Sequence, residues 1–269
     1  MKYSILILLV TFISFNCSNK KNNGALIKTE EVQYTANGIP LKGFLSYDEN
    51  QEGLRPGIIV VHEWWGNNDY SKRRAEMLAK LGYIALAIDM YGNGKQAHNP
   101  SDAGKFAAEA MQNMDEAKAR FDAGVNFLKE QSQTDTNRIA AIGYCFGGST
   151  VQQLAYSGAD LKAIVSFHGG LINPPAKASD LVKASFLICH GADDPFVTEQ
   201  DLQKYLSLMK ATSLDWEMII YGGAKHSFTN PDADKAGMEA LKYNPVADRR
   251  SWAQMKLFFN EFFSSPKKK

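Results

Sequence analysis

The chain has 269 residues, enough to bury a full hydrophobic core, and a single domain of this size is common among α/β proteins. Hydrophobic residues make up 45% of the sequence and charged residues 22%, which is typical of a globular protein and excludes a disordered or fibrous chain. A net charge of +1 gives no sign of a nucleic-acid or acidic-surface partner.

The start of the chain has the features of an export signal. Lys2 precedes an apolar run over residues 5–10, and Cys17 follows after a short mixed segment. The apolar run is shorter than the roughly 20 residues that a membrane-spanning helix needs. A basic start before a short apolar stretch is typical of a secretory signal, so we expect the protein to be exported.

Cys17 and its surroundings resemble the processing site of a bacterial lipoprotein, where the cysteine is lipidated after cleavage. A polar segment follows Cys17 and suits a tether. Phe15 and Asn16 are larger than the residues usual there, so ordinary secretion and an uncleaved anchor remain alternatives. We predict a signal peptide over residues 1–17 with Cys17 as candidate lipidation site, and a flexible tether over residues 18–28. The location would be the periplasm or cell envelope, with the lipid anchor as the membrane contact.

Strands and helices alternate after the tether. The segments 33–35 and 41–45 flank an Asn-Gly pair and predict an antiparallel hairpin. The β-branched run at 57–62 predicts a strand buried on both faces. Residues 72–81 have apolar positions at helical spacing and predict the first helix.

The remaining elements continue this alternation. We expect strands at 83–90, 138–143, 163–167, 186–189 and 216–221, and helices at 103–131 (broken near the middle), 149–155, 198–209 and 247–263. An antiparallel start followed by β-α alternation predicts a mostly parallel sheet with helices on both faces. No Pro- or Ser-rich linker interrupts this part, so we predict one α/β domain over residues 29–265.

The segment 143–148, Gly-Tyr-Cys-Phe-Gly-Gly, joins a predicted strand to a predicted helix. Glycines two residues before and two after Cys145 permit the sharp turn of a nucleophile elbow, with cysteine in place of the commoner serine. The helix N-terminus that follows favours a thiolate. Cys145 is therefore the candidate nucleophile. The alternative is a glycine-rich turn that holds a small buried cysteine.

Two further residues stand just past the ends of predicted strands. Asp194 follows the strand at 186–189, and His226 follows the strand at 216–221. The chain order of nucleophile, acid and histidine is that of the α/β-hydrolase triad. Asp193 competes with Asp194 for the acid role, although a turn position suits it better.

The other histidines and cysteines are expected to be structural. His62, His168 and His190 also end predicted strands, where a structural role is the commoner one. Cys189 lies inside an apolar strand and is expected in the core. We therefore do not expect a disulfide between Cys189 and Cys145.

Several motifs in order resemble the dienelactone hydrolase family, which has the α/β-hydrolase fold. The resemblance runs from Glu30 to Phe263. It rests on His-Glu-Trp-Trp-Gly at 62–66, Asp-Met-Tyr-Gly at 89–92, the Cys145 elbow, Asp-Pro-Phe-Val at 194–197 and His-Ser-Phe at 226–228. The resemblance implies a hydrolase of carboxylic esters or lactones with a Cys145-His226-Asp194 triad. It implies no metal and no organic cofactor.

The resemblance also implies roles for residues next to the triad. The backbone amides of Trp64 and Phe146 match the positions of the family's oxyanion hole. Glu63 matches the glutamate that contacts the resting thiol and helps to form the thiolate. Trp65 and Tyr91, together with Trp64, would shape an apolar pocket, although a structural role is equally compatible with the sequence.

The sequence departs from the family pattern where a substrate carboxylate would bind. Asn93 and Asn230 stand at the positions of two arginines that the resemblance implies. Lys95 could substitute for one of them, but an ammonium group lacks the bidentate fork of a guanidinium. We therefore expect a small-molecule ester or lactone substrate without carrying over the acidic lactone itself.

Two other function classes remain open. One is an amidase or peptidase on the same fold, against which we weigh the absence of any propeller or lid segment for peptides. The other is a lipid-anchored binding protein without turnover, against which we weigh the complete triad and Glu63. Labelling of Cys145 by a thiol-reactive acyl probe discriminates between an enzyme and a binding protein.

Overall fold

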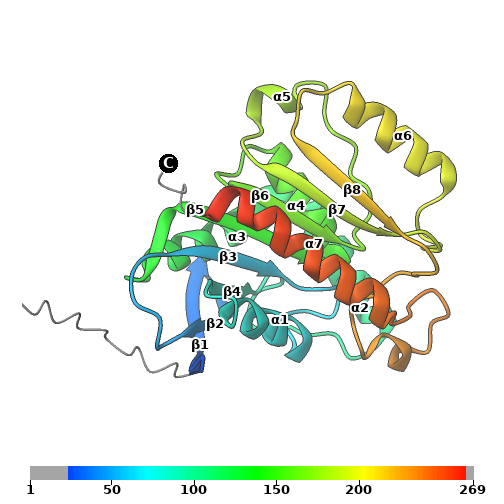
Figure 1. Cartoon of the computed structure of the whole chain (residues 1–269). Helices are drawn as coiled ribbons and strands as arrows, with labels where there is room; N and C mark the ends of the chain where they lie inside the picture. Colours follow the sequence, from blue (N-terminus) through cyan, green and yellow to red (C-terminus); the bar gives the residue numbers. More distant parts are fainter. Residues whose placement is uncertain (1–23, 265–269) are drawn as a thin grey trace, which may run out of the picture.

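Figure 1 shows the structure, a computed structural model that describes residues 24–264. The predicted signal peptide and Cys17 lie outside the described residues. The strands are β1 (Ile27–Ala36), β2 (Ile39–Asp48), β3 (Arg55–Val61), β4 (Ile84–Ile88), β5 (Thr134–Tyr144), β6 (Ala163–Phe167), β7 (Ser185–Gly191) and β8 (Trp216–Tyr221). The helices are α1 (Asp69–Ala79), α2 (Pro100–Gln112), α3 (Met114–Lys129), α4 (Phe146–Tyr156), α5 (Ala178–Leu181), α6 (Glu199–Lys210), η1 (Ala233–Ala236, a 3-10 helix) and α7 (Pro245–Phe263).

All eight strands form one sheet in the order β1-β2-β4-β3-β5-β6-β7-β8. β1 and β2 form the predicted antiparallel hairpin, and β2 is also antiparallel to β4. Every further pairing along the sheet is parallel. The predicted mostly parallel α/β sheet is therefore confirmed.

The hairpin begins earlier than we predicted. Ile27 pairs with Asp48 across β1 and β2, and the Asp48 carboxylate accepts a 2.9 Å hydrogen bond from the Leu26 amide. Residues 27 and 28 are therefore part of the sheet, and the prediction that the tether extends through them is wrong. The sequence pattern missed them because β1 is an edge strand whose outward positions are polar.

Helices cover both faces of the sheet, as the alternation predicted (Figure 1). Ile58 and Val60 of β3 belong to the core under α1 and α7. Ile59 and Val61 belong to the core under α2, α3, α4 and α6. Because every residue of β3 is buried, the strand carries a continuous apolar run rather than an alternating one. Within residues 24–264, none of the helices is both long and apolar enough to cross a membrane.

Polar caps set the helix boundaries. The Asn68 side chain accepts a hydrogen bond from the Tyr70 amide, so α1 starts three residues before the predicted residue 72. Asn113 divides the predicted long helix into α2 and α3, and its side chain caps α3 through the Glu116 amide. The short helices α5 and η1 were not predicted, since neither is long enough to show a periodic pattern.

The parallel strands deliver the candidate site residues to one edge of the sheet. Glu63 follows β3, Cys145 follows β5, Asp194 follows β7 and His226 follows β8. The carboxyl ends of parallel strands share an edge, and ligands of open α/β sheets bind there. The topology thus assembles residues separated by more than half of the chain.

Candidate active site

Cys145 lies in the sharp turn between β5 and α4. Its backbone has a φ of 53° and a ψ of −116°, a conformation that strains a non-glycine residue. A Cβ atom at Gly143 would lie 2.0 Å from the Gly147 carbonyl oxygen, and one at Gly147 would lie 2.3 Å from the Val61 carbonyl oxygen. Both positions require glycine, so the chain has the backbone of a nucleophile elbow. The Cys145 side chain is partly exposed.

His226 and Asp194 form a buried pair at the same edge. The Nδ1 atom of His226 lies 2.7 Å from Oδ2 of Asp194. The neighbouring Asp193 is exposed, whereas Asp194 is 4% exposed. The structure therefore brings Asp194, rather than Asp193, to the histidine.

The negative groups around His226 favour its protonated form. Burial alone lowers the pKa of an imidazole. At His226 the charge of a Cys145 thiolate and hydrogen bonds to Asp194 and to Cys145 outweigh this, and they raise the pKa to about 10. The site is therefore suited to a thiolate-imidazolium pair.

Two backbone amides beside Cys145 can receive an oxyanion. Phe146 is the first residue of α4, where no earlier turn of helix can accept its N–H. Among the described residues, neither the Phe146 N–H nor the Trp64 N–H has a hydrogen-bond acceptor. Tyr91 bridges the two loops, because its hydroxyl donates to the Trp64 carbonyl at 3.0 Å and its ring packs against Phe146 at 5.5 Å.

Glu63 is buried beside His226, and its two carboxylate oxygens have separate partners. Ser227 Oγ donates to Oε1 at 2.9 Å, and Asn230 Nδ2 donates to Oε2 at 2.6 Å. Burial raises the pKa of Glu63, and these two hydrogen bonds and the nearby His226 oppose that rise. Ser227 and Asn230 also line a cavity of about 500 Å³ that extends toward α1 and the loop before α2.

The family assignment follows from a comparison with known proteins. A family model described as "Dienelactone hydrolase family" matches residues 41–263. The chain belongs to the dienelactone hydrolase family. It is a hydrolase, as the sequence motifs predicted.

Individual relatives agree with this assignment. A dienelactone hydrolase-like promiscuous phosphotriesterase from metagenomic libraries shares 37% identity with a TM-score of 0.84, covering 90% of this chain and all of the other. A "Probable 2-oxo-3-(5-oxofuran-2-ylidene)propanoate lactonase" of Bradyrhizobium sp is 30% identical over 74% of this chain and 81% of its own. A "Putative carboxymethylenebutenolidase" of Aquifex aeolicus is 26% identical over 86% of this chain and 97% of its own. The α/β-hydrolase fold is thereby confirmed.

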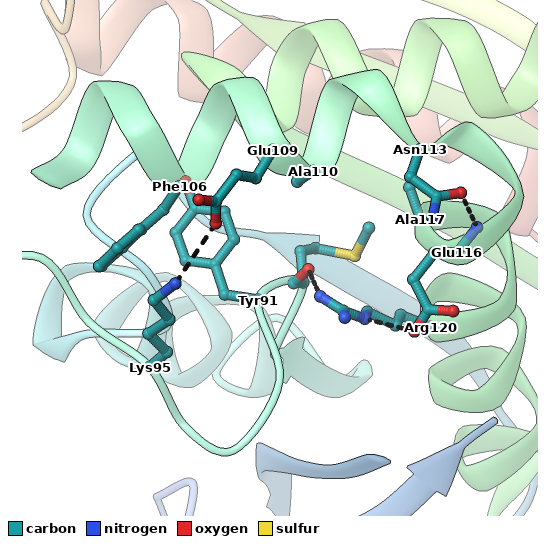
Figure 2. Close-up of a pocket in the computed structure, with 10 residues that line it drawn as sticks. Tyr91, Lys95, Phe106, Glu109, Ala110, Asn113, Glu116, Ala117 and Arg120 are labelled. Carbon is teal, nitrogen blue, oxygen red and sulfur yellow. Dashed lines mark hydrogen bonds and ion pairs between the residues drawn. The ribbon is translucent and has the colours of Figure 1, made fainter. Parts of the chain in front are cut away.

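The cations near the active site of this family member already have partners (Figure 2). The Lys95 ammonium lies 3.5 Å from a Glu109 carboxylate oxygen and 3.5 Å from the centre of the Phe106 ring. Arg120, which lines the same hollow of about 150 Å³, donates to the Met90 carbonyl at 2.8 Å. Both side chains are therefore engaged in this structure, Lys95 in an exposed ion pair and Arg120 at a backbone carbonyl.

The wall of the site near Cys145 is apolar. Cys145 packs against the core cluster that also receives Phe106 and Met111 of α2 and Leu171 and Ile172 of the loop after β6. Phe106 of α2 approaches the site through Tyr91, whose ring centre lies 5.8 Å from that of Phe106 and 5.5 Å from that of Phe146, the residue after Cys145. These surroundings suit an uncharged group.

Cys189 and the strand-end histidine His62 have structural surroundings. Cys189 is buried in β7, and burial raises the pKa of its thiol to about 12. Cys145 and Cys189 are both free thiols. His62 is fully buried and bonds the Glu63 carbonyl through Nδ1 at 2.5 Å, which holds the turn that carries Trp64.

Sequence reasoning missed two side chains of this site. Ser227 holds Glu63, and its only sequence signal was its place directly after His226. Asn230 was identified as a missing arginine, but its hydrogen bond to Glu63 was not anticipated. Both contacts join segments more than 160 positions apart, which a single sequence does not reveal.

Proposed function

We propose that the protein hydrolyses neutral carboxylic esters or lactones, with Cys145 as nucleophile, His226 as acid-base and Asp194 as the group that orients His226. The observation that carries the proposal is the elbow at Cys145 on the same sheet edge as the buried His226-Asp194 pair, whose atoms lie 2.7 Å apart. A cysteine in this position beside a histidine is an activated nucleophile.

The proposed reaction has two steps. The Cys145 thiolate attacks the acyl carbon, and the Phe146 and Trp64 amides hold the developing oxyanion. His226 gives its proton to the leaving alkoxide, which leaves an acyl-thioester on Cys145. His226 then takes a proton from a water molecule that attacks the thioester, and the acid product leaves with the thiolate restored.

Glu63 fits the role of a proton acceptor for the resting thiol: it takes the Cys145 proton before the attack and returns it to the thiolate after the acid product has left. A raised pKa makes a carboxylate a better base, and burial raises the pKa of Glu63. Its oxygens accept from Ser227 and Asn230 in this structure, so the role requires Glu63 to turn away from at least one of them. Uncharged donors allow that movement more easily than an arginine would, because an ion pair is the stronger bond.

The proposed substrate is uncharged at the acyl group. Asn93 and Asn230 replace the two arginines, Lys95 and Arg120 are engaged elsewhere, and Cys145 packs against the apolar core cluster that Phe106 and Met111 also contact. An amidase or peptidase is not favoured, since an amine leaves less readily than an alkoxide and needs stronger protonation. A binding protein without turnover would have no use for the strained Cys145 backbone.

The experiment is a set of aryl and alkyl esters of increasing acyl length, together with one lactone, one amide and one phosphotriester, presented to the purified protein. The phosphotriester is included because a relative of 37% identity is described as a promiscuous phosphotriesterase. We expect turnover of the neutral esters and the lactone, and none of the amide. Absence of turnover on every ester and lactone would contradict the proposed function.

We further propose that the protein is exported and held at the membrane by lipid on Cys17. The apolar run before Cys17 and the polar segment after it support this. A lipoprotein cysteine carries several acyl chains, which anchor more firmly than one. The wild type should partition into the detergent phase and Cys17→Ala should not. Recovery of the wild type entirely in the soluble cytoplasm would contradict export.

A further inference from the structure

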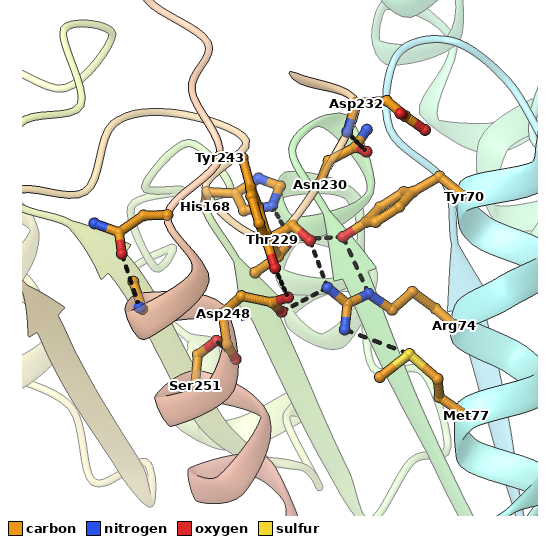
Figure 3. Close-up of polar contacts among 12 residues, drawn as sticks. Tyr70, Arg74, Met77, His168, Thr229, Asn230, Asp232, Tyr243, Asp248 and Ser251 are labelled. Carbon is orange, nitrogen blue, oxygen red and sulfur yellow. Dashed lines mark hydrogen bonds and ion pairs between the residues drawn. The ribbon is translucent and has the colours of Figure 1, made fainter. Parts of the chain in front are cut away.

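A chain of buried polar groups runs from the backbone of Cys145 to α1 and α7. Figure 3 shows the part of this chain from His168 to Asp248. The chain of polar groups begins at the Cys145 amide, which donates to the Phe167 carbonyl at 3.0 Å and to Nδ1 of His168 at 3.1 Å. His168 has no exposed surface and a φ of 41°, which is unfavourable for a bulky residue. The fold thus holds this imidazole directly behind the nucleophile at a cost in backbone strain.

The hydrogen bonds of His168 determine its tautomer. Because Nδ1 accepts from an N–H, the ring proton of the neutral imidazole must be on Nε2. Nε2 lies 2.6 Å from Oγ1 of Thr229 and donates to it. The same Thr229 oxygen lies 2.5 Å from the Tyr70 hydroxyl, which continues the chain into α1. Both nitrogens of His168 therefore have a partner.

Arg74 anchors the far end of this chain. Its guanidinium is 3% exposed and donates to the Thr229 carbonyl and to Asp248 of α7, both at 2.6 Å, and to the Tyr70 hydroxyl at 3.2 Å. A buried cation is tolerated only when its donors are satisfied. Arg74 thereby joins α1, α7 and the loop after β8, and it holds Thr229 where the hydroxyl can receive His168.

We propose that His168 is a positioning residue for Cys145: its Nδ1 atom holds the Cys145 amide and so keeps the thiol aimed at His226, while Thr229 holds His168 in the required tautomer. This inference rests on the proposed function. The ring of His168 also packs edge-on against His226, with 5.5 Å between ring centres, so one imidazole contacts both members of the thiolate-imidazolium pair.

A neutral His168 is essential to this arrangement. Protonation would place a hydrogen on Nδ1 facing the Cys145 N–H, and it would put a second cation beside His226. Burial, then the charges of His226 and Arg74, hold the pKa of His168 well below its usual range. The imidazole therefore remains an acceptor while its neighbour His226 is charged.

The test compares variants of His168 that keep either its hydrogen-bond acceptor or its aromatic ring, but not both. His168→Asn keeps an acceptor close to the place of Nδ1 and tolerates a positive φ, whereas His168→Phe keeps an aromatic ring without an acceptor. Thr229→Ser keeps the hydroxyl, and Thr229→Val keeps the shape without it. The readouts are kcat and KM on a neutral ester and the rate of iodoacetamide alkylation at Cys145, followed by peptide mass so that Cys189 serves as an internal control.

We expect His168→Phe to lower kcat and the Cys145 alkylation rate by up to about tenfold, as the loss of one neutral hydrogen bond implies, with KM nearly unchanged. In His168→Asn most of kcat and of the alkylation rate should be retained. Both quantities should be lower in Thr229→Val than in Thr229→Ser. Equal rates for His168→Phe and the wild type, or equal impairment of His168→Asn and His168→Phe, would overturn the proposal. If His168→Phe does not fold, the Thr229 pair decides the matter in the same way.

The alkylation readout keeps this inference distinct from the proposed function. The Cys145 thiol reacts with iodoacetamide whether or not esters are turned over. A wild type without ester hydrolysis contradicts the proposed function alone, whereas an unchanged alkylation rate in His168→Phe contradicts the positioning role alone.

Discussion

Asn230 donates a 2.6 Å hydrogen bond to the Glu63 carboxylate from the position where the family resemblance implies an arginine. The buried carboxylate is therefore held by an uncharged amide and, on its other oxygen, by the Ser227 hydroxyl. No guanidinium is present at this position to bind an acidic substrate. In the proposed function, this contact is the main reason to expect an uncharged substrate.

Asn230→Arg should move the substrate preference toward acidic compounds. A charge-assisted hydrogen bond to a substrate carboxylate contributes about 1.5–3 kcal/mol, which is roughly tenfold or more in specificity. The measurement is kcat/KM on a neutral aryl ester and on its carboxylate-bearing analogue. Asn230→Gln, which is longer but uncharged, is the control. A wild-type preference of about tenfold or more for the acidic analogue would show that another cation forms an acid site.

Glu63→Gln should separate stability from catalysis. The glutamine can accept from Asn230 with its oxygen and donate to Ser227 with its nitrogen, while it removes a buried charge. Since burial raises the pKa of Glu63, ionisation opposes folding at neutral pH, and removing the charge should raise the free energy of unfolding. The midpoint of thermal unfolding should therefore shift upward. Hydrolysis should fall by about tenfold or more if Glu63 accepts the thiol proton.

A stable but slow Glu63→Gln variant supports the base role. Wild-type activity in this variant would assign Glu63 to structure alone. Ser227→Ala offers a matched comparison, because it removes one partner of Glu63 and leaves the carboxylate in place.

The pH dependence should show a high alkaline limit. Folding raises the pKa of His226 from 6.5 to about 10, so it favours the protonated form. The corresponding stability is fully present below pH 6.5 and is lost as the pH rises through about 10. kcat/KM should therefore remain level through neutral pH and decline near pH 10, where His226 can no longer protonate the leaving group.

Asp194→Asn should move that alkaline limit to lower pH, because a charged partner of the His226 ring is lost. We expect activity to fall by about 100-fold, as for the loss of an acid-base group. Asp193→Asn, one residue away and exposed, should leave both the limit and the rate unchanged. An unchanged alkaline limit in Asp194→Asn would contradict the pairing of Asp194 with His226.

Much of the fold could be predicted from local sequence patterns. The strands at 163–167 and 216–221 were predicted to the residue, since each is a short apolar or β-branched run between turn signals. The edge strand β1 was shortened in the prediction because its exposed positions are polar. The helix boundaries at Asn68 and Asn113 differ from the predicted ones, because hydrophobic periodicity does not detect a capping side chain.

The candidate site could also be predicted only in part from the sequence. Cys145, Asp194 and His226 could be predicted because each directly follows a predicted strand. The glycines around Cys145 added a second signal, because a sharp turn leaves no room for a side chain at their positions. The hydrogen bonds of His168 were not predictable, since they depend on a strained backbone and on Thr229 packing 61 positions away. Long-range polar contacts of this kind require the tertiary structure.

The most direct test of the central claim is to trap the acyl-enzyme with a slowly deacylating ester and locate the acyl group by peptide mass. We expect the acyl group on Cys145 in the wild type and in Cys189→Ala, which should retain most hydrolysis. Cys145→Ala should show neither adduct nor turnover, and Cys145→Ser should be strongly impaired, because a hydroxyl ionises far less readily than a thiol. An acyl group on another residue, or equal loss of activity in Cys145→Ala and Cys189→Ala, would contradict the assignment of Cys145 as the nucleophile.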